Sequence, residues 1–195
     1  MLKSLVISIF LILISGFEYN KKNINTVSLY LNSLNSLMAN FIQINELGEH
    51  SDGQIKIQKP GKIRIEFNNT DKLLVGDGKK IALINKKFSQ ITYYNYEQLP
   101  LQILLTKEFK LKSFFIKDFS EYENIIEIEL SESSGQNHGS IRLIFENKPL
   151  KLKKWIINEF NGGKIEVFLS DLEVNKNIDK KFFRIDSPKK IILGE

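Results

Sequence analysis

The chain has 195 residues, which is enough for one domain with a substantial core. Its 28 basic and 23 acidic side chains are interspersed along the sequence, and the formal net charge of +5 is only weak evidence for an anionic partner. There is no cysteine, which excludes disulfides, thiolate metal sites, cysteine nucleophiles and a lipid-modified cysteine.

The N-terminus has the order of a secretory signal. Lys3 precedes an uncharged apolar run over residues 5–14, and Ser15 and Gly16 follow it. As a helix of about 1.5 Å rise per residue, this run is too short to span a hydrocarbon core of about 30 Å. We therefore expect residues 1–16 to be a signal peptide and residues 17–195 to form a single domain. An uncleaved anchor or a buried helix is the alternative.

An amphipathic helix is predicted after a polar spacer. Five apolar residues at spacings of four, three, four and three fall on one stripe of a helix. They are Val27, Leu31, Leu34, Met38 and Phe41. We expect this stripe to pack against an apolar surface of the fold.

Apolar and polar residues alternate from Phe41 onward, which predicts β-strands with one apolar face. Residues 54–58 and 62–67 form a predicted hairpin, because Pro60 and Gly61 fit the second and third positions of a type II turn. In all we expect about ten or eleven antiparallel strands with short turns. The other predicted strands cover residues 73–75, 80–85, 88–94, 114–116, 126–130, 141–145, 152–160, 165–169 and 182–185.

Two segments interrupt this pattern. Residues 97–106 predict a short helix, apolar nearly all round, with Pro100 near its first turn, and residues 131–140 predict a solvated loop. The two predicted helices are too few to cover the apolar face of so many strands. A curved open sheet with helical lids would leave an apolar hollow, whereas a filled sandwich is the alternative.

Catalytic and metal-binding constellations do not stand out. His50 and His138 are the only histidines, and each lies among polar turn residues, so they make no zinc signature. No nucleophile elbow is present, and residues 76–80 lack the spacing of a phosphate loop and predict a hairpin turn. Glu127 and Glu129 alternate with apolar residues, which is typical of the solvated face of a strand. We therefore expect no enzyme, no metal and no cofactor.

Aromatic residues gather beside lysines between residues 86 and 96. The aromatic residues could stack on single-stranded nucleic acid beside Lys86 and Lys87; they are Phe88, Tyr93, Tyr94 and Tyr96. An exported protein meets little nucleic acid, and the same aromatic residues suit a sheet or a pocket wall. We therefore expect no nucleic-acid partner.

Four blocks of residues occur in an order that is known from one protein family. They are residues 39–43 (ANFIQ), Gly53 with 59–65 (KPGKIRI), 75–79 (VGDGK), and 152–155 (LKKW) leading through Gly162 to 182–185 (FFRI). In these blocks the chain resembles the outer-membrane lipoprotein carrier (LolA) family of periplasmic chaperones. The blocks span almost all of the expected mature chain.

The resemblance implies an open, incomplete antiparallel β-barrel whose apolar concave face is lidded by helices. The basic residue that latches the lid in the family corresponds to Lys59, where members commonly have arginine. Lysine lacks the planar guanidinium fork, so we expect a weaker or differently made latch. The family's cavity positions correspond to Ile63 and Ile65, and its apolar lid position to Leu104. We further expect the hollow to be lined by Phe41, Ile57, Phe67, Leu83 and Leu101.

The resemblance also implies a function in the periplasm. Such a carrier collects acylated lipoproteins from an inner-membrane ABC lipoprotein-releasing complex and passes them to an outer-membrane receptor, and we expect it to be a monomer. The alternatives are a lipid-sensing regulator with the same half-barrel, a carrier of other lipids, and an envelope hydrolase. The missing nucleophile argues against the hydrolase.

Overall fold

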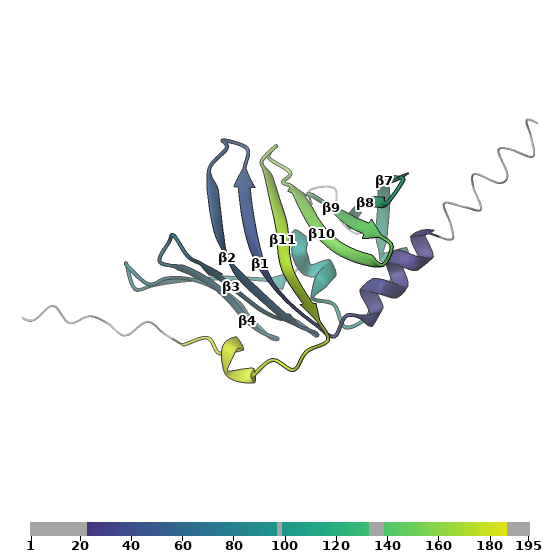
Figure 1. The fold of residues 1–195 in the computed structure, drawn as a ribbon. Coiled ribbons are helices and arrows are strands. Elements are labelled where there is room, and N and C mark those ends of the chain that lie inside the picture. Colours follow the sequence, from purple (N-terminus) through teal and green to yellow (C-terminus); the bar gives the residue numbers. More distant parts are fainter. Residues whose placement is uncertain (1–22, 97–98, 133–138, 187–195) are drawn as a thin grey trace, which may run out of the picture.

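A computed structural model describes residues 23–96, 99–132 and 139–186, which contain eleven strands and one α-helix, residues 23–33 (Figure 1). The strands are β1 (Ser36–Asn45), β2 (His50–Gln58), β3 (Lys62–Phe67), β4 (Lys72–Asp77), β5 (Ile81–Asn85), β6 (Gln90–Tyr94), β7 (Phe114–Tyr122), β8 (Ile125–Glu132), β9 (Ser140–Asn147), β10 (Leu150–Asn158) and β11 (Lys164–Val174). Short 3-10 helices are η2 (Pro100–Leu104), η3 (Leu111–Ser113) and η4 (Lys180–Phe183).

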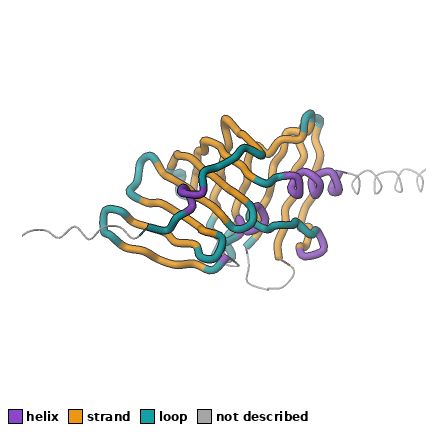
Figure 2. Tube along the Cα trace, turned by 90° about the horizontal axis from the view of Figure 1, so that it is seen from below, coloured by secondary structure: helices purple, strands orange, loops and turns teal. Residues whose placement is uncertain are grey.

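All eleven strands form one antiparallel sheet in the order β6-β5-β4-β3-β2-β1-β11-β10-β9-β8-β7. Two meanders therefore meet in the middle, where β1 pairs with β11 and Phe41 lies opposite Leu169. The outermost strands, β6 and β7, do not pair with each other, so the curved sheet stays open (Figures 1 and 2). This confirms the predicted mainly β, open and antiparallel architecture.

The helix and η2 lie on the concave side of the sheet (Figure 2). Val27 and Leu31 of the helix, and Leu101 and Ile103 of η2, are buried in one cluster with the inward-facing strand residues. Burial of these aliphatic side chains holds the two elements against the sheet. Within the described residues, no helix combines the length and the apolar character that crossing a bilayer requires.

The predicted stripe of the first helix is wrong beyond Leu31. The helix ends at residue 33, and β1 begins at Ser36, so Met38 and Phe41 lie on a strand. Phe41 is buried on the concave side, whereas Met38 is half-buried and has the opposite parity in the strand. These residues form a strand and not a continuation of the helix, because β1 is the central strand of the sheet. Its backbone groups form hydrogen-bonded ladders with both β2 and β11.

The hairpin turns follow the glycine signals of the sequence. Between β2 and β3 the loop is Lys59, Pro60 and Gly61, with Gly61 at φ +70° and a cis peptide bond before Pro60. Between β4 and β5, Gly78 has φ +99°. Because L side chains rarely adopt such φ values, glycine is needed at both positions. The hairpin prediction for residues 76–80 is confirmed.

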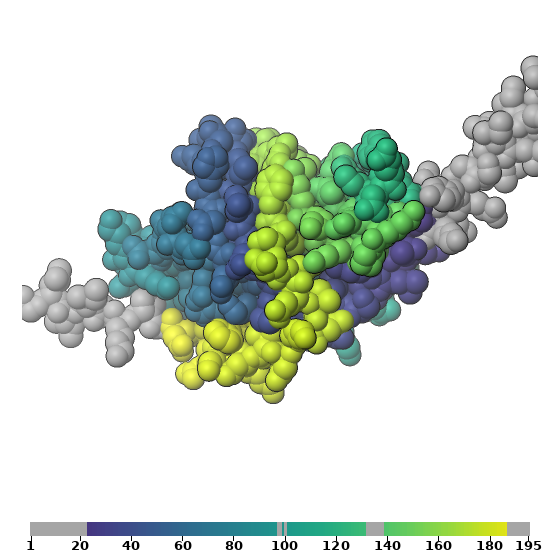
Figure 3. All heavy atoms as spheres, viewed as in Figure 1, coloured from purple at the N-terminus to yellow at the C-terminus, as the bar shows by residue number. Residues whose placement is uncertain are grey.

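The C-terminal segment crosses the convex side, shown in yellow in Figure 3. The predicted strand at residues 182–185 is wrong, because residues 180–183 form η4, where the Asp179 carboxylate accepts a hydrogen bond from the Lys181 N–H. Phe183 is buried, and Arg64 of β3 donates to the Phe182 carbonyl (3.0 Å). The segment packs across strands instead of pairing with an edge, so it cannot extend the sheet.

Candidate functional site: the lidded concave face

Strand register assigns the side chains of the concave face. Across β2, β3, β4 and β5, Ile57 lies opposite Ile63, while Ile65 lies opposite Leu74, which in turn lies opposite Leu83. Directly opposed residues of antiparallel strands point to the same face, so these five share the concave side. The apolar surface is therefore continuous from the middle of the sheet to β5.

All eight sequence-predicted cavity residues belong to this face or to its lid. Phe41, Ile57, Ile63, Leu101 and Leu104 are buried in the central cluster. Ile65 and Phe67 are partly buried and pack against that cluster. Leu83 shares the face by register and is half-buried, although it lies outside the packed cluster.

Phe41 and Phe67 contact each other across a glycine. Their ring centroids are 5.5 Å apart in an edge-to-face arrangement. Gly53 pairs with Phe41 on one side and with Phe67 on the other, so it stands between the two rings in the sheet. Without a side chain at Gly53, the rings reach each other and form an aromatic wall at this part of the face.

The lid is η2 with its flanking residues, and it is apolar as predicted. Leu101, Ile103, Leu104 and Leu105 are all buried. The Gly61 N–H, in the β2–β3 turn, donates to the Leu105 carbonyl (2.8 Å). Because turn and lid share this backbone hydrogen bond, the KPG turn seen in the sequence is a fixed anchor point of the lid.

Tyr96, which precedes the lid, joins two turns through its hydroxyl. The hydroxyl donates to the Gly61 carbonyl (2.5 Å) and accepts a hydrogen bond from the Gly78 N–H (3.0 Å). Burial raises the pKa of this phenol above its usual value, although the Gly78 hydrogen bond lowers it in part. In the sequence, Tyr96 is only one of the aromatic residues near Lys86 and Lys87, and nothing local in the chain predicts this bridge.

Lys59, the residue predicted to latch the lid, contacts the helix directly. Its Nζ donates to the Leu31 carbonyl (2.7 Å), one of the last-turn carbonyls that lack a partner within the helix. Its own backbone N–H donates to the Asn35 carbonyl (2.9 Å). Burial lowers the pKa of Lys59 to about 8. A latch at this position would thus act on the helix, next to the Gly61 anchor of η2.

A small gap lies between sheet, helix end and lid. Its volume is about 10 Å³, which is about the space that one water molecule needs. An acyl chain can therefore enter at this point only if the lid or the helix moves. The gap is lined by Leu34, Asn35, Ser36, Leu37, Ile57, Lys59 and Leu104.

The second half of the concave face was missed as part of the site. Strands β8 to β11 contribute buried residues to the same cluster, among them Ile128, Leu143, Phe145, Trp155 and Val167. The alternation at residues 126–130 and 141–145 was present in the sequence and could have indicated them. Among the predicted solvated histidines, His50 is exposed at the start of β2, and His138 lies outside the described residues.

The sequence profile described as "Outer membrane lipoprotein carrier protein LolA" matches residues 32–186. The chain belongs to the LolA family. The match includes the whole sheet, the lid η2 on its concave side and η4 on its convex side. The family consists of carrier proteins, so the expectation that this chain is not an enzyme is confirmed at the family level.

Two relatives are named outer-membrane lipoprotein carrier protein. One, from Legionella pneumophila (strain Paris), is 24% identical over 191 residues, covering 93% of this chain and 94% of the relative. The other, from Dechloromonas aromatica (strain RCB), is 27% identical over 170 residues, covering 82% and 81%. A DUF1329 family protein from Desulfovibrio piger has a TM-score of 0.52 at 7% identity, covering 83% of this chain and 95% of that structure, which is a likeness of fold.

Proposed function

We propose that this LolA family protein carries lipoproteins through the periplasm by holding their acyl chains on the lidded concave face. The observation that carries the proposal is the continuous apolar surface beneath η2, whose cover is fixed by a small set of hydrogen bonds. The cavity would be lined by the eight predicted residues, and Lys59 would help to hold the lid and helix closed.

Cargo and lid compete for the same surface. Burying a sixteen-carbon chain at about 0.8 kcal/mol per CH₂ would contribute about 12 kcal/mol. Releasing the four buried lid residues Leu101, Ile103, Leu104 and Leu105 would cost about 1.5–3 kcal/mol each, or about 6–12 kcal/mol in total. The difference between the two terms is about 0–6 kcal/mol, much less than the gain from burying the acyl chain alone. A carrier built in this way binds its cargo weakly enough to release it to a receptor.

The partners follow from the direction of transport. An inner-membrane ABC lipoprotein-releasing complex would supply the cargo, and an outer-membrane receptor would accept it while the carrier acts as a monomer. The two relatives named as outer-membrane lipoprotein carrier protein support this assignment. The apolar N-terminal residues before the matched region are consistent with export.

Mass spectrometry of the bound lipid tests the proposal. The protein is recovered without detergent from the soluble envelope fraction of the expressing bacterium, and its ligand is extracted and sequenced. We expect diacylglycerol that is covalently linked to an N-terminal cysteinyl peptide. Free phospholipid or glycolipid alone would make the protein a carrier of other lipids and would overturn the lipoprotein assignment.

Depletion of the protein separates a carrier from a sensor. If the protein is a carrier, lipoproteins accumulate in the inner-membrane fraction when it is depleted. Normal lipoprotein sorting with altered expression of envelope-stress genes would instead identify a lipid-sensing regulator. Expression of the intact chain from a plasmid is the control and should restore the starting distribution.

A further inference from the structure

The two ends of the open sheet carry opposite charge. Residues 71–94, which hold β4 to β6, contain five lysines and two aspartates, a net charge of +3. Residues 114–131, from β7 and β8 at the other end, contain five carboxylates and one lysine, a net charge of −4. Arg142 of the neighbouring strand β9 forms ion pairs with three of these carboxylates, those of Asp118, Glu127 and Glu129. The chain is therefore polarised along its strand order. We call these segments the basic edge and the acidic edge.

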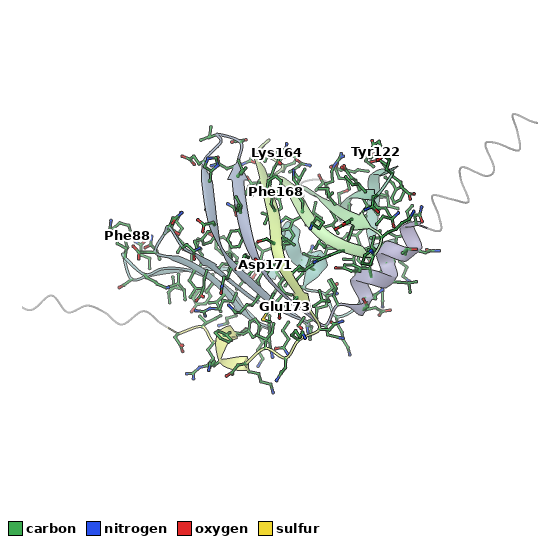
Figure 4. All side chains as sticks on the ribbon, viewed as in Figure 1. Phe88, Tyr122, Lys164, Phe168, Asp171 and Glu173 are labelled. Carbon is green, nitrogen blue, oxygen red and sulfur yellow. The ribbon has the colours of Figure 1, made fainter. Side chains whose placement is uncertain are left out.

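Large aromatic side chains project from the basic edge. Phe88 in the β5–β6 turn is 64% exposed, and Tyr93 on β6 is 57% exposed. Lysines accompany them, because Lys87 Nζ lies 5.6 Å from the Phe88 ring centroid and Lys80 Nζ lies 5.6 Å from that of Tyr93. Figure 4 places Phe88 at the far end of the molecule from Tyr122, which belongs to the acidic edge.

The aromatic residues of the basic edge face both sides of the sheet. Tyr93 lies opposite Ala82, which faces the convex side, while Tyr94 lies opposite Ile81, which faces the concave side. Aromatic rings thus emerge on both faces of one edge strand, with Phe88 beyond its end. A flat surface into which such an edge can sink fits this shape better than a protein helix that needs a groove.

The lysines of the basic edge are available to an anionic partner. Lys72, Lys79, Lys80, Lys86 and Lys87 are all exposed. Within the part of the chain that the structure describes, none of the five has a carboxylate at ion-pair distance. By contrast, Lys154 and Lys164 are both engaged by Glu166. Lys79 and Lys86 act on the Asp77 and Glu66 carboxylates only from beyond ion-pair distance, so the basic edge keeps its net charge of +3.

We propose that the basic edge docks the protein on an anionic phospholipid surface. Aromatic side chains favour the level of the lipid headgroups. Lysines near the surface are attracted to anionic headgroups, and each lysine raises the partition coefficient of the protein by a factor of about five. The acidic edge then points away from the bilayer, so docking selects one orientation. The inference rests on the proposed function only in that a periplasmic carrier meets two membranes.

A single fluorescent label tests the docking. The chain lacks cysteine, so Phe88→Cys and the matched control Tyr122→Cys each accept one environment-sensitive dye. Tyr122 is 62% exposed, close to the exposure of Phe88, but belongs to the acidic edge. With vesicles of phosphatidylcholine and phosphatidylglycerol, we expect a blue shift for the label at 88 and none at 122. Each label reports only on its own edge. If the apolar N-terminal residues inserted into the vesicle, that insertion alone would not give a blue shift at 88 without one at 122.

Charge variants give the second measurement. Lys86→Gln with Lys87→Gln removes two of the lysines and should lower partitioning into these vesicles about 30-fold in a flotation assay. Raising the salt from about 0.1 M to about 0.5 M should also release the protein. Lys148→Gln, at an exposed lysine in the β9–β10 turn, is the control and should leave partitioning nearly unchanged, because Lys148 lies outside the basic edge.

Three results would overturn the proposal. They are equal binding to pure phosphatidylcholine vesicles, an equal response of the labels at 88 and 122, and self-association without vesicles that the Lys86→Gln/Lys87→Gln variant abolishes. The last result would mean that the basic edge meets the acidic edge of a second copy. The vesicles contain no lipoprotein, so failure of docking leaves the carrier proposal standing, and failure of the carrier proposal leaves docking measurable.

Discussion

The side-chain amide of Asn32 pairs with the backbone of Phe109, 77 residues further along the chain. The amide Nδ2 donates to the Phe109 carbonyl (3.1 Å), and its Oδ1 accepts from the Phe109 N–H (2.7 Å). This reciprocal pair joins the last turn of the helix to the segment that follows the lid. Phe109 itself is buried and stacks on Phe114.

Asn32→Ala should loosen the segment after the lid. It leaves the backbone groups of Phe109 without their partner and should lower the free energy of unfolding by about 1–3 kcal/mol. Amide hydrogen exchange should become faster between residues 99 and 113, while β9 and β10 keep their protection. Asn69→Ala, which removes one exposed bond to Asp52, is the control and should change neither value appreciably. Unchanged exchange in Asn32→Ala would mean that the pair does not hold the segment.

Tyr96→Phe should separate the two turns that the hydroxyl bridges. The Gly61 carbonyl loses the hydroxyl that donates to it, and the Gly78 N–H loses the oxygen that accepts from it. We therefore expect the free energy of unfolding to fall by about 1–2 kcal/mol. Urea unfolding can be followed by Trp155, the single tryptophan, which is buried. Tyr94→Phe on the neighbouring strand should be close to neutral because Tyr94 is exposed. Equal stability of both variants would contradict the bridge.

Lys59 should make stability depend on pH in alkaline solution. Its pKa falls from 10.5 in the unfolded chain to about 8 in the fold, because burial disfavours the charged form. Between these pH values the unfolded chain binds more protons, so the free energy of unfolding should rise as pH increases from about 8 to about 10.5. Lys59→Met should remove this slope in urea titrations across that window. Persistence of the slope in Lys59→Met would assign it to other groups.

Ile103→Ala should weaken the lid as a competitor of cargo. Ile103 is fully buried in the central cluster, and the substitution should destabilise the empty protein by about 2–4 kcal/mol. A fluorescent fatty acid should then bind more tightly, since less lid burial is lost on opening. Ile84→Ala, buried in the separate cluster on the convex side, should destabilise similarly without raising affinity. Equal affinity of the two variants would refute competition between lid and cargo.

Ile65→Glu should block acyl binding by placing a carboxylate on the concave face. Ile65 is half-buried, so the substitution should leave the fold intact, as circular dichroism can check. We expect lipoprotein delivery and fatty-acid binding to fall at least tenfold, which corresponds to about 1.4 kcal/mol. Ile42→Glu, on the outer side of β1, should preserve both because Ile42 is already exposed. Intact delivery by the Ile65→Glu protein would place the cargo elsewhere.

Local sequence patterns predicted those elements whose conformation depends on residues close together in the chain. The hairpin around Pro60 and Gly61 was predictable because alternation marks the strands and Gly61 accepts a φ of +70°. The short lid helix was predictable from Pro100 and the apolar residues that follow it. By contrast, the helix predicted from the apolar stripe between Val27 and Phe41 was too long. Phe41 fits the helical spacing by coincidence and belongs to a strand that is paired on both sides.

The sequence by itself determined that this protein is a sheet with an apolar face, because period-two alternation and turn glycines act within a few residues. It also indicated most of one wall of the site, through Ile57, Ile63 and Ile65. Only the tertiary structure decided that β1 joins β11, that Lys59 reaches Leu31 and that Asn32 holds Phe109. These contacts join residues far apart in the chain, and their energy depends on burial and geometry that no local pattern encodes.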